Sequence, residues 1–340
     1  MNAYSSALYG GRLTVDLDAI AANWSLLRSR LAPGSECAAT IKANAYGTGQ
    51  AETATRLFEE GCRAFFVAVP TEAIALRQTL PSATIYALDG LFPDTADLLL
   101  QHDVRPVLGS LDELKEWAEL CRTSGKSFPA AVHVDTGIHR LGLSGDEFGT
   151  ALADPELMGP FKPSLLMSHL ACGSDPDHPM NKEQLDRFIA LTSPFKGVPR
   201  SLANSAGVLM GPDYHFELVR PGISLYGGRA FDHGDNPMQP VAKVEARIMI
   251  VRNVPKGDAI GYGATQTAKR TLRNAVVAAG YADGLLRRAS SSDSRRRARR
   301  SGRGNRPRGG PAGPRLGPGD RRLPRGHGDG RRRRAPHHPW

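Results

Sequence analysis

Short apolar runs rich in β-branched residues alternate with segments of helical periodicity through most of the chain. Eight runs fit buried strands, at 37–41, 64–69, 83–88, 104–108, 130–134, 164–168, 201–204 and 216–220. The segments between them, such as 51–60, 111–121 and 182–190, carry apolar residues at helical spacing. Strands that alternate with helices form parallel sheets, and eight such units favour a closed (β/α)₈ barrel over an open sheet.

The two ends of this region have a different pattern. Residues 13–17 alternate apolar and polar side chains as a strand does, and helical spacing follows directly. Residues 241–270 alternate in the same way around a Pro-Lys-Gly turn, which is typical of antiparallel strands. We therefore expect a barrel over residues 1–235 and a second β domain over residues 236–290, with the strand at 13–17 belonging to the β domain.

Residues 291–340 differ from the rest of the chain in composition. They hold sixteen arginines, no lysine and three aspartates, and they lack isoleucine, valine, phenylalanine, tyrosine and methionine. The formal charge of the chain is +10, yet residues 1–290 carry 28 basic and 31 acidic residues. The basic charge therefore belongs to the tail and does not indicate a nucleic-acid-binding body. Because the tail has so little to bury, we expect it to be disordered.

The four cysteines, Cys37, Cys62, Cys121 and Cys172, lie far apart in the sequence. They form no CxxC pair and no zinc spacing with histidine, so we expect reduced thiols and no metal site. The N-terminus lacks the basic and apolar regions of a signal peptide, and no run of about 18 apolar residues occurs. The expected location is the cytoplasm, with no membrane partner.

Polar residues follow several predicted strands at the point where each strand ends. In a parallel barrel these ends carry the loops that form the active site. They are Lys42 and Tyr46 after the first run, Arg140 after the fifth, His169 after the sixth, Asn204 and Ser205 after the seventh, and Arg220, Gly222 and Ile223 after the eighth. Taken alone, Lys42 is more often a solvated charge; the alternative is an amine whose pKa is lowered by an apolar pocket and which attacks an aldehyde. Small hydroxyl and glycine residues at the last two ends are typical of a phosphate site.

Six segments carry a more specific signal because of their order along the chain. They are IKANAYG, HVDTGIHRLGL, MSHLA, ANSAG, VRPGISLYG and IGYGAT. Together they resemble the motifs of alanine racemases, which are pyridoxal-phosphate enzymes of fold type III, over roughly residues 12–287. The resemblance implies a (β/α)₈ barrel followed by a β domain, a homodimer with two shared active sites, and interconversion of L- and D-alanine, which supplies D-alanine for peptidoglycan.

The resemblance also implies roles for individual residues. Lys42 would bind pyridoxal 5′-phosphate covalently and serve as one of two bases, and Tyr262 of the partner subunit would be the other. Racemisation needs a base on each face of a planar carbanion, which two residues in opposed positions supply. The groups implied to bind the phosphate are Tyr46, Ser205 and the backbone amides of Gly222 and Ile223.

Further roles concern the ring of the cofactor and the substrate. Arg220 would face the pyridine nitrogen, with His169 supporting it, and a guanidinium there would leave that nitrogen unprotonated. Arg140 would contact the phenolic oxygen of the cofactor and the substrate. Asn204 would belong to the cofactor site as well.

The chain departs from the family pattern at three places. Many members have a histidine where Thr48 stands, and a carbamylated lysine where His133 stands, so no carbamate is expected; we interpret both as variation. Members continue past residue 284 through strands that carry a Met-Asp pair and a tyrosine, and neither occurs here. The tail is rich in residues with GC-rich codons, which indicates a frameshift near residues 287–294. We therefore expect impaired dimer assembly and activity.

Three other functions stay open at this point. Another fold-type III enzyme, such as an amino-acid decarboxylase, would have no tyrosine base that matches Tyr262. A non-catalytic cofactor carrier would consist of a barrel alone, whereas here a second domain begins. A nucleic-acid-binding role rests only on the tail, which would bind phosphate backbones without sequence specificity. The preference for alanine over another small amino acid is open too.

Overall fold

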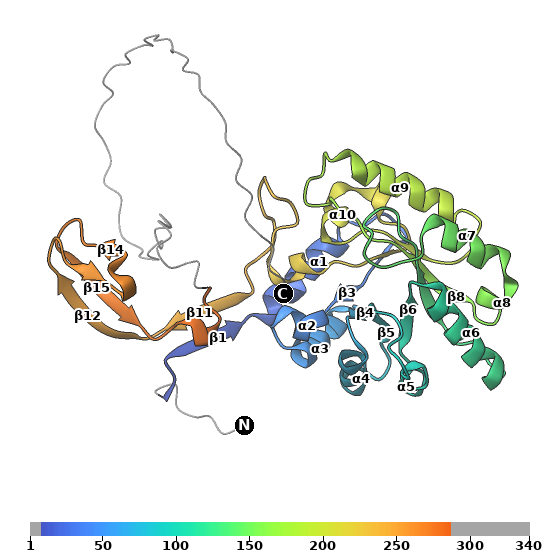
Figure 1. Ribbon diagram of the computed structural model, residues 1–340, viewed down its shortest axis with the longest axis horizontal. Helices are drawn as coiled ribbons and strands as arrows, with labels where there is room; N and C mark the ends of the chain where they lie inside the picture. Colours follow the sequence, from blue (N-terminus) through green and yellow to red (C-terminus); the bar gives the residue numbers. More distant parts are fainter. Residues whose placement is uncertain (1–7, 287–340) are drawn as a thin grey trace, which may run out of the picture. The chain divides into compact units, whose positions relative to one another are not determined.

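The computed structural model describes residues 8–286, and a curved parallel sheet is the largest sheet among them (Figure 1). Seven strands follow one another in chain order across this sheet. They are β3 (Ala39–Thr40), β4 (Ala64–Val67), β5 (Thr84–Ala87), β6 (Arg105–Leu108), β7 (Ala130–His133), β8 (Pro163–Met167) and β9 (Arg200–Ser201). The predicted parallel order is confirmed, and all of these strands except β8 are shorter than the apolar runs that indicated them.

An eighth strand joins the two edges of this sheet. β10 (Leu218–Val219) pairs in parallel with β2 (Glu36–Cys37), which directly precedes β3. On its other side the Arg220 N–H donates to Ala203 O at 2.9 Å, just beyond β9. The predicted first strand at 37–41 is therefore broken into two pieces, because its first half pairs with β10 and its second half with β4. The result is the predicted barrel-like (β/α)₈ arrangement.

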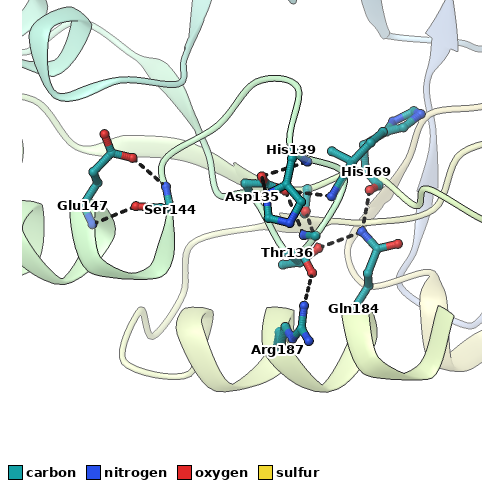
Figure 2. Close-up of polar contacts among 11 residues, drawn as sticks. Asp135, Thr136, His139, Ser144, Glu147, His169, Gln184 and Arg187 are labelled. Carbon is teal, nitrogen blue, oxygen red and sulfur yellow. Dashed lines mark hydrogen bonds and ion pairs between the residues drawn. The ribbon is translucent and has the colours of Figure 1, made fainter. Parts of the chain in front are cut away.

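Helices alternate with the strands (Figure 1). They are α1 (Leu17–Arg28), α2 (Lys42–Tyr46), α3 (Gln50–Glu60), α4 (Pro70–Thr79), α5 (Ala96–Gln101), α6 (Leu111–Ser124), α7 (Gly145–Ala153), α8 (Pro155–Met158), α9 (Pro179–Thr192) and α10 (Ser205–Met210), with 3₁₀ turns η2 (Pro212–Tyr214) and η3 (Ile223–Tyr226). Several begin at caps that the sequence supplies. Ser110 accepts from the Glu113 N–H, and Ser144 and Glu147 form a capping box at the start of α7 (Figure 2).

The core lies on both sides of the sheet because successive side chains of a strand point to opposite faces. Phe65 of β4 packs in the cluster that holds Trp24 and Leu57 of the helices. Its neighbour Phe66 packs inside the barrel, where its ring stacks on Tyr86 at 4.7 Å between centroids. The barrel interior is thus filled by apolar side chains, so that polar groups gather where the strands end.

Antiparallel strands make up the rest of the described chain. β1 (Gly11–Val15) pairs with β11 (Ala242–Ala246), β12 (Ile248–Val254) with β15 (Leu272–Val277), and β13 (Ala259–Ile260) with β14 (Gln266–Thr267). Two further 3₁₀ turns are η4 (Tyr262–Ala264) and η5 (Tyr281–Asp283). The alternation at 241–270 therefore predicted antiparallel strands correctly. The strand expected at 13–17 lies two residues earlier, because Asp16 caps the helix that begins at Leu17.

Between residues 8 and 286, none of the helices has both the length and the apolar character needed to cross a lipid bilayer. The predicted disorder of residues 291–340 and the predicted frameshift near 287–294 lie outside the described residues.

Candidate active site

A cavity of about 540 Å³ is lined by residues that follow the strands of the barrel. The residues predicted for the site from barrel strand ends all line it: Lys42, Tyr46, Arg140, His169, Asn204, Ser205, Arg220, Gly222 and Ile223. They lie between residues 42 and 223 of the chain and follow five different strands, β3, β7, β8, β9 and β10. The barrel topology therefore brings these nine residues to one place.

Tyr262 is the predicted site residue that does not line this cavity. It begins η4, between β13 and β14, and its side chain is fully exposed at 101 %. Among the described residues, no group of three or more histidine, cysteine, aspartate or glutamate side chains is placed to hold a metal ion.

The chain that follows Lys42 turns with left-handed backbone angles. Four successive residues that are not glycine, from Ala43 to Tyr46, have φ of 53° or 54°. Such a conformation costs on the order of 1–2 kcal/mol for each L-residue, so tertiary contacts must hold it. Asn44 supplies two of them, because its N–H donates to Glu72 of α4 at 3.3 Å and its side chain accepts from the Gln50 N–H at 2.8 Å. Strain beside a candidate reactive lysine is typical of functional sites.

Substitution of the exposed Ala43 by glycine is expected to stabilise the protein by up to about 1 kcal/mol. Glycine adopts a positive φ without strain, and this gain outweighs the larger backbone entropy that glycine has in the unfolded chain. The matched control is Ala75→Gly, at an exposed position inside the right-handed helix α4, where a loss of about 1 kcal/mol is expected. Urea unfolding of both variants measures the two signs. Destabilisation by Ala43→Gly as large as that by Ala75→Gly would contradict the account of the turn.

Arg220 is a buried cation at the floor of the cavity. It is 5 % exposed, and its guanidinium donates to Ser201 Oγ and, at 2.6 Å, to Ser168 O. Within residues 8–286 it forms no ion pair with a carboxylate. Burial lowers the pKa of Arg220 to about 9, which leaves it charged at neutral pH. A buried charge without a counter-ion is unfavourable, so this position suits an anionic or polar ligand.

Two histidines stand beside Arg220 in the cavity lining. Burial, together with the positive charge of Arg220, lowers the pKa of His133 to about 4 and that of His169 to about 3. Both rings are therefore neutral at pH 7, and the Nε2 atom of His133 has no hydrogen-bond partner. Among the hydrogen bonds of the described residues, none joins His169 to Arg220. The hydrogen bonds of the Arg220 guanidinium go to Ser168 and Ser201.

The low pKa of His133 predicts that the cofactor-free protein loses stability in mild acid. Because the unfolded chain binds more protons than the folded one between about pH 6.5 and pH 4, the free energy of unfolding falls as the pH falls through that window. The share of His133 is about 2 kcal/mol between pH 7 and pH 5. Denaturant unfolding at pH 7 and pH 5 measures this change in the free energy of unfolding. His133→Leu should lack it, whereas His233→Leu, which changes an exposed histidine, should keep it. Equal pH dependence in both variants would contradict the assignment.

Ser205 and the residues after β10 line one part of the cavity. Asn204 caps α10 by accepting from the N–H groups of Ala206 and Gly207, at 3.0 and 3.1 Å. Ser205 Oγ accepts from the Gly222 N–H at 2.9 Å and from the Ser224 N–H at 3.2 Å.

Glycine at position 222 leaves room for the Tyr46 hydroxyl, since a Cβ there would lie 2.5 Å from it and would displace that side chain. The predicted donor Gly222 thus already bonds to Ser205. The hydroxyl proton of Ser205 and the amide of Ile223 are the donors available to an anion.

The charges of the lining residues are unbalanced. Four cationic side chains, from Lys42, Arg140, Arg220 and Arg229, face the cavity with the single carboxylate of Asp89. Such a field attracts anions. Asp89 and Arg229 were missed from the sequence. Asp89 directly follows the run at 83–88, so the strand-end rule applies to it, whereas Arg229 lies well past the last strand and gave no signal.

Comparison with known proteins gives consistent matches. Residues 15–230 match the family described as alanine racemase, N-terminal domain, and residues 241–303 match the C-terminal domain of the same enzymes. The chain is 46 % identical over 280 residues to an alanine racemase of Rhodospirillum rubrum, a match that covers 82 % of this chain and 75 % of that protein. It is 43 % identical over 281 residues to a biosynthetic alanine racemase of Agrobacterium fabrum, covering 83 % and 71 %.

Solved structures agree with these relatives. The alanine racemase of Bartonella henselae, described with covalently bound pyridoxal phosphate, has a TM-score of 0.78 at 36 % identity and covers 82 % of this chain and 78 % of that chain. That of Pseudomonas aeruginosa, a biosynthetic enzyme, has a TM-score of 0.72 at 33 % identity, covering 82 % and 77 %.

A (β/α)₈ barrel with an amine and arginines around a cavity at its strand ends is typical of barrel enzymes that bind anionic ligands. With these matches, the chain belongs to the alanine racemase family. The predicted family and fold are confirmed, and the reading as an amino-acid decarboxylase is set aside.

Proposed function

We propose that the chain interconverts L- and D-alanine with pyridoxal 5′-phosphate held at the mouth of the barrel, and that Lys42 and Tyr262 are its two bases. The observation that carries this proposal is that Lys42, Ser205 and Arg220 line one cavity with an excess of positive charge. The covalently bound pyridoxal phosphate described for the relative from Bartonella henselae supports the same cofactor here.

The donor groups of the cavity fit the chemistry of this cofactor, which carries a phosphate, a phenolic oxygen and an aldehyde. The phosphate would be held by the hydroxyls of Ser205 and Tyr46 and by the Ile223 amide. The amine of Lys42 would attach to the aldehyde carbon. Arg140 would neutralise the phenolic oxygen, and Arg220 would face the ring nitrogen.

When bound, pyridoxal 5′-phosphate withdraws electrons from the α-carbon of an amino acid attached to it and so acidifies the hydrogen on that carbon. The Lys42 amine would remove or return this proton on one face. The Tyr262 phenol would do the same on the opposite face, since inversion of configuration needs a proton donor and a proton acceptor on opposite sides. Arg220 keeps its positive charge at neutral pH because its pKa is about 9, so it would hold its own proton beside the ring nitrogen.

Tyr262 would reach the cavity of a second copy of the chain. Its phenol is fully exposed, and apolar side chains of β12 and β15 are exposed as well, among them Met249 at 63 % and Val276 at 47 %. Exposed apolar side chains of this size on a sheet favour burial against a partner, which supports the proposed homodimer.

We also propose that the enzyme works in the cytoplasm, where its four free cysteines stay reduced, and supplies D-alanine for peptidoglycan.

Incubation of the purified chain with pyridoxal 5′-phosphate and L-alanine tests this proposal. Because enantiomers have equal free energies, the reaction should approach equal amounts of L- and D-alanine from either side, as chiral chromatography measures. Bound cofactor without any D-alanine would favour the non-catalytic carrier instead. The rate measured against that of the relative from Rhodospirillum rubrum tests the expected impairment of activity.

A further inference from the structure

A buried amide outside the cavity connects two of the loops that line it. Gln184 of α9 is completely buried, with 0 % exposure. Its side-chain oxygen accepts from the Ala171 N–H at 2.8 Å. Its side-chain nitrogen donates to His169 O at 2.9 Å and to Thr136 Oγ1 at 3.2 Å (Figure 2). One side chain therefore holds the loop after β7 and the loop after β8 together.

The hydrogen bonds continue from Gln184 to the buried arginine of the site. Thr136 Oγ1 pairs with Ser168 Oγ at 2.8 Å, and Ser168 O accepts from Arg220 at 2.6 Å. Arg187, three residues after Gln184 on α9, donates to Thr136 O at 3.1 Å (Figure 2). Thr136 and Ser168 are buried, at 1 % and 0 % exposure, so water does not compete for these bonds. The network thus runs without interruption from α9 to the floor of the cavity.

An amide is the side chain that these partners require. The oxygen has to accept from a backbone N–H while the nitrogen donates to two oxygens, and the Gln184 amide does both. A carboxylate would lack the donors. An apolar side chain would leave the Ala171 N–H and His169 O without the partner that Gln184 supplies. It would also leave Thr136 Oγ1 with Ser168 alone. The position therefore favours an amide, although Gln184 is not among the residues that line the active-site cavity.

At other strand ends too, one side chain forms hydrogen bonds to two neighbouring loops, a link that we call a tie. Glu72 of α4 accepts from the N–H groups of Ala68, after β4, and Asn44, after β3. Glu113 of α6 accepts from Gly109 N–H at 2.7 Å and Leu91 N–H at 2.8 Å, after β6 and β5. The tie made by Gln184 differs because its loops carry Arg140 and His169 and because it continues to Arg220.

We propose that Gln184 is a positioning residue of the active site, which fixes where Arg140, His169 and Arg220 stand around the cofactor. This inference rests on the proposed function, since it assigns those three side chains to the cofactor. Loss of the tie frees the loops after β7 and β8 to shift. A shift there alters how the cofactor is held and aligned, and not only how stable the barrel is.

The test compares Gln184→Met, which removes the tie and keeps the length of the side chain, with Glu113→Met, which removes the matched tie between β5 and β6. For each chain we would measure the Kd for pyridoxal 5′-phosphate by absorbance titration, kcat and KM for L-alanine, and the urea midpoint of the cofactor-free protein. Gln184→Met is expected to raise that Kd about tenfold and lower kcat by about 10–100-fold, with little change in KM. Glu113→Met is expected to lower the urea midpoint and leave Kd and kcat within about twofold of wild type.

A folded Gln184→Met that loses stability as Glu113→Met does, with wild-type Kd and kcat, would overturn the proposal. If Gln184→Met does not fold, Thr136→Val decides, because it removes one link of the network and keeps the shape of the side chain. A several-fold rise in the Kd of Thr136→Val supports the proposal, and a wild-type Kd and kcat overturns it. A wild-type chain that binds no pyridoxal 5′-phosphate would instead overturn the proposed function, and this inference with it.

Discussion

Substitution of Lys42 by alanine is expected to abolish covalent attachment of pyridoxal 5′-phosphate and to lower kcat/KM for alanine racemisation by at least about a thousandfold. Among the described residues that line the cavity, only Lys42 carries a primary amine. The variant therefore loses the group that attaches to the aldehyde and, with it, a base on one face of the substrate. Absorbance of the bound cofactor and the rate of D-alanine formation measure the two effects separately.

The matched control is Lys115→Ala on α6. Lys115 is exposed and pairs with Asp112 at 3.4 Å, an ion pair that contributes little to stability. This variant should keep cofactor absorbance and rate within about twofold of wild type. The role of Lys42 would be contradicted if Lys42→Ala kept the absorbance of the covalently attached cofactor. It would also be contradicted if Lys115→Ala lost that absorbance to the same extent.

Tyr262→Phe is expected to lower racemisation by about 10²–10⁴-fold and to leave the Kd for pyridoxal 5′-phosphate unchanged. The phenol is fully exposed and does not line the cavity of its own chain, so its loss should not disturb cofactor binding there. In deuterated water the variant should still exchange the α-hydrogen of one enantiomer, because Lys42 serves one face alone. Mass spectrometry of each enantiomer measures this exchange.

Tyr281→Phe provides the control for Tyr262→Phe, since Tyr281 is another exposed tyrosine, at 65 %, and lies in η5 of the same part of the chain. It should racemise alanine at the wild-type rate. Exchange of both enantiomers by Tyr262→Phe at similar rates would show that a single base serves both faces, and the two-base proposal would then be wrong.

The strand ends could be located from the sequence because parallel strands buried on both faces appear as apolar runs. Lys42, Arg140 and Arg220 follow such runs, and the barrel topology then brings them together. The break of the first strand into β2 and β3 could not be predicted, because it depends on which neighbour each half pairs with.

The left-handed turn after Lys42 has no local signal. Ala43, Asn44 and Ala45 contain no glycine, and alanine favours a right-handed helix. The turn is held by Glu72 of α4, which lies 28 residues away. Gln184 was missed for a related reason: it resembles any polar residue on a helix, and its partner Thr136 lies 48 residues away. Contacts of this kind belong to the tertiary structure and leave no periodicity in the sequence.

The most direct test of the account is to locate the cofactor on the protein. The wild-type chain is loaded with pyridoxal 5′-phosphate, reduced with borohydride to fix the attached cofactor, digested, and mapped by mass spectrometry. We predict that the cofactor mass is found on the peptide that contains Lys42, at a stoichiometry near one per chain. Label on another lysine such as Lys115 or Lys182, or label spread over many lysines, would contradict the assignment of this cavity as the active site.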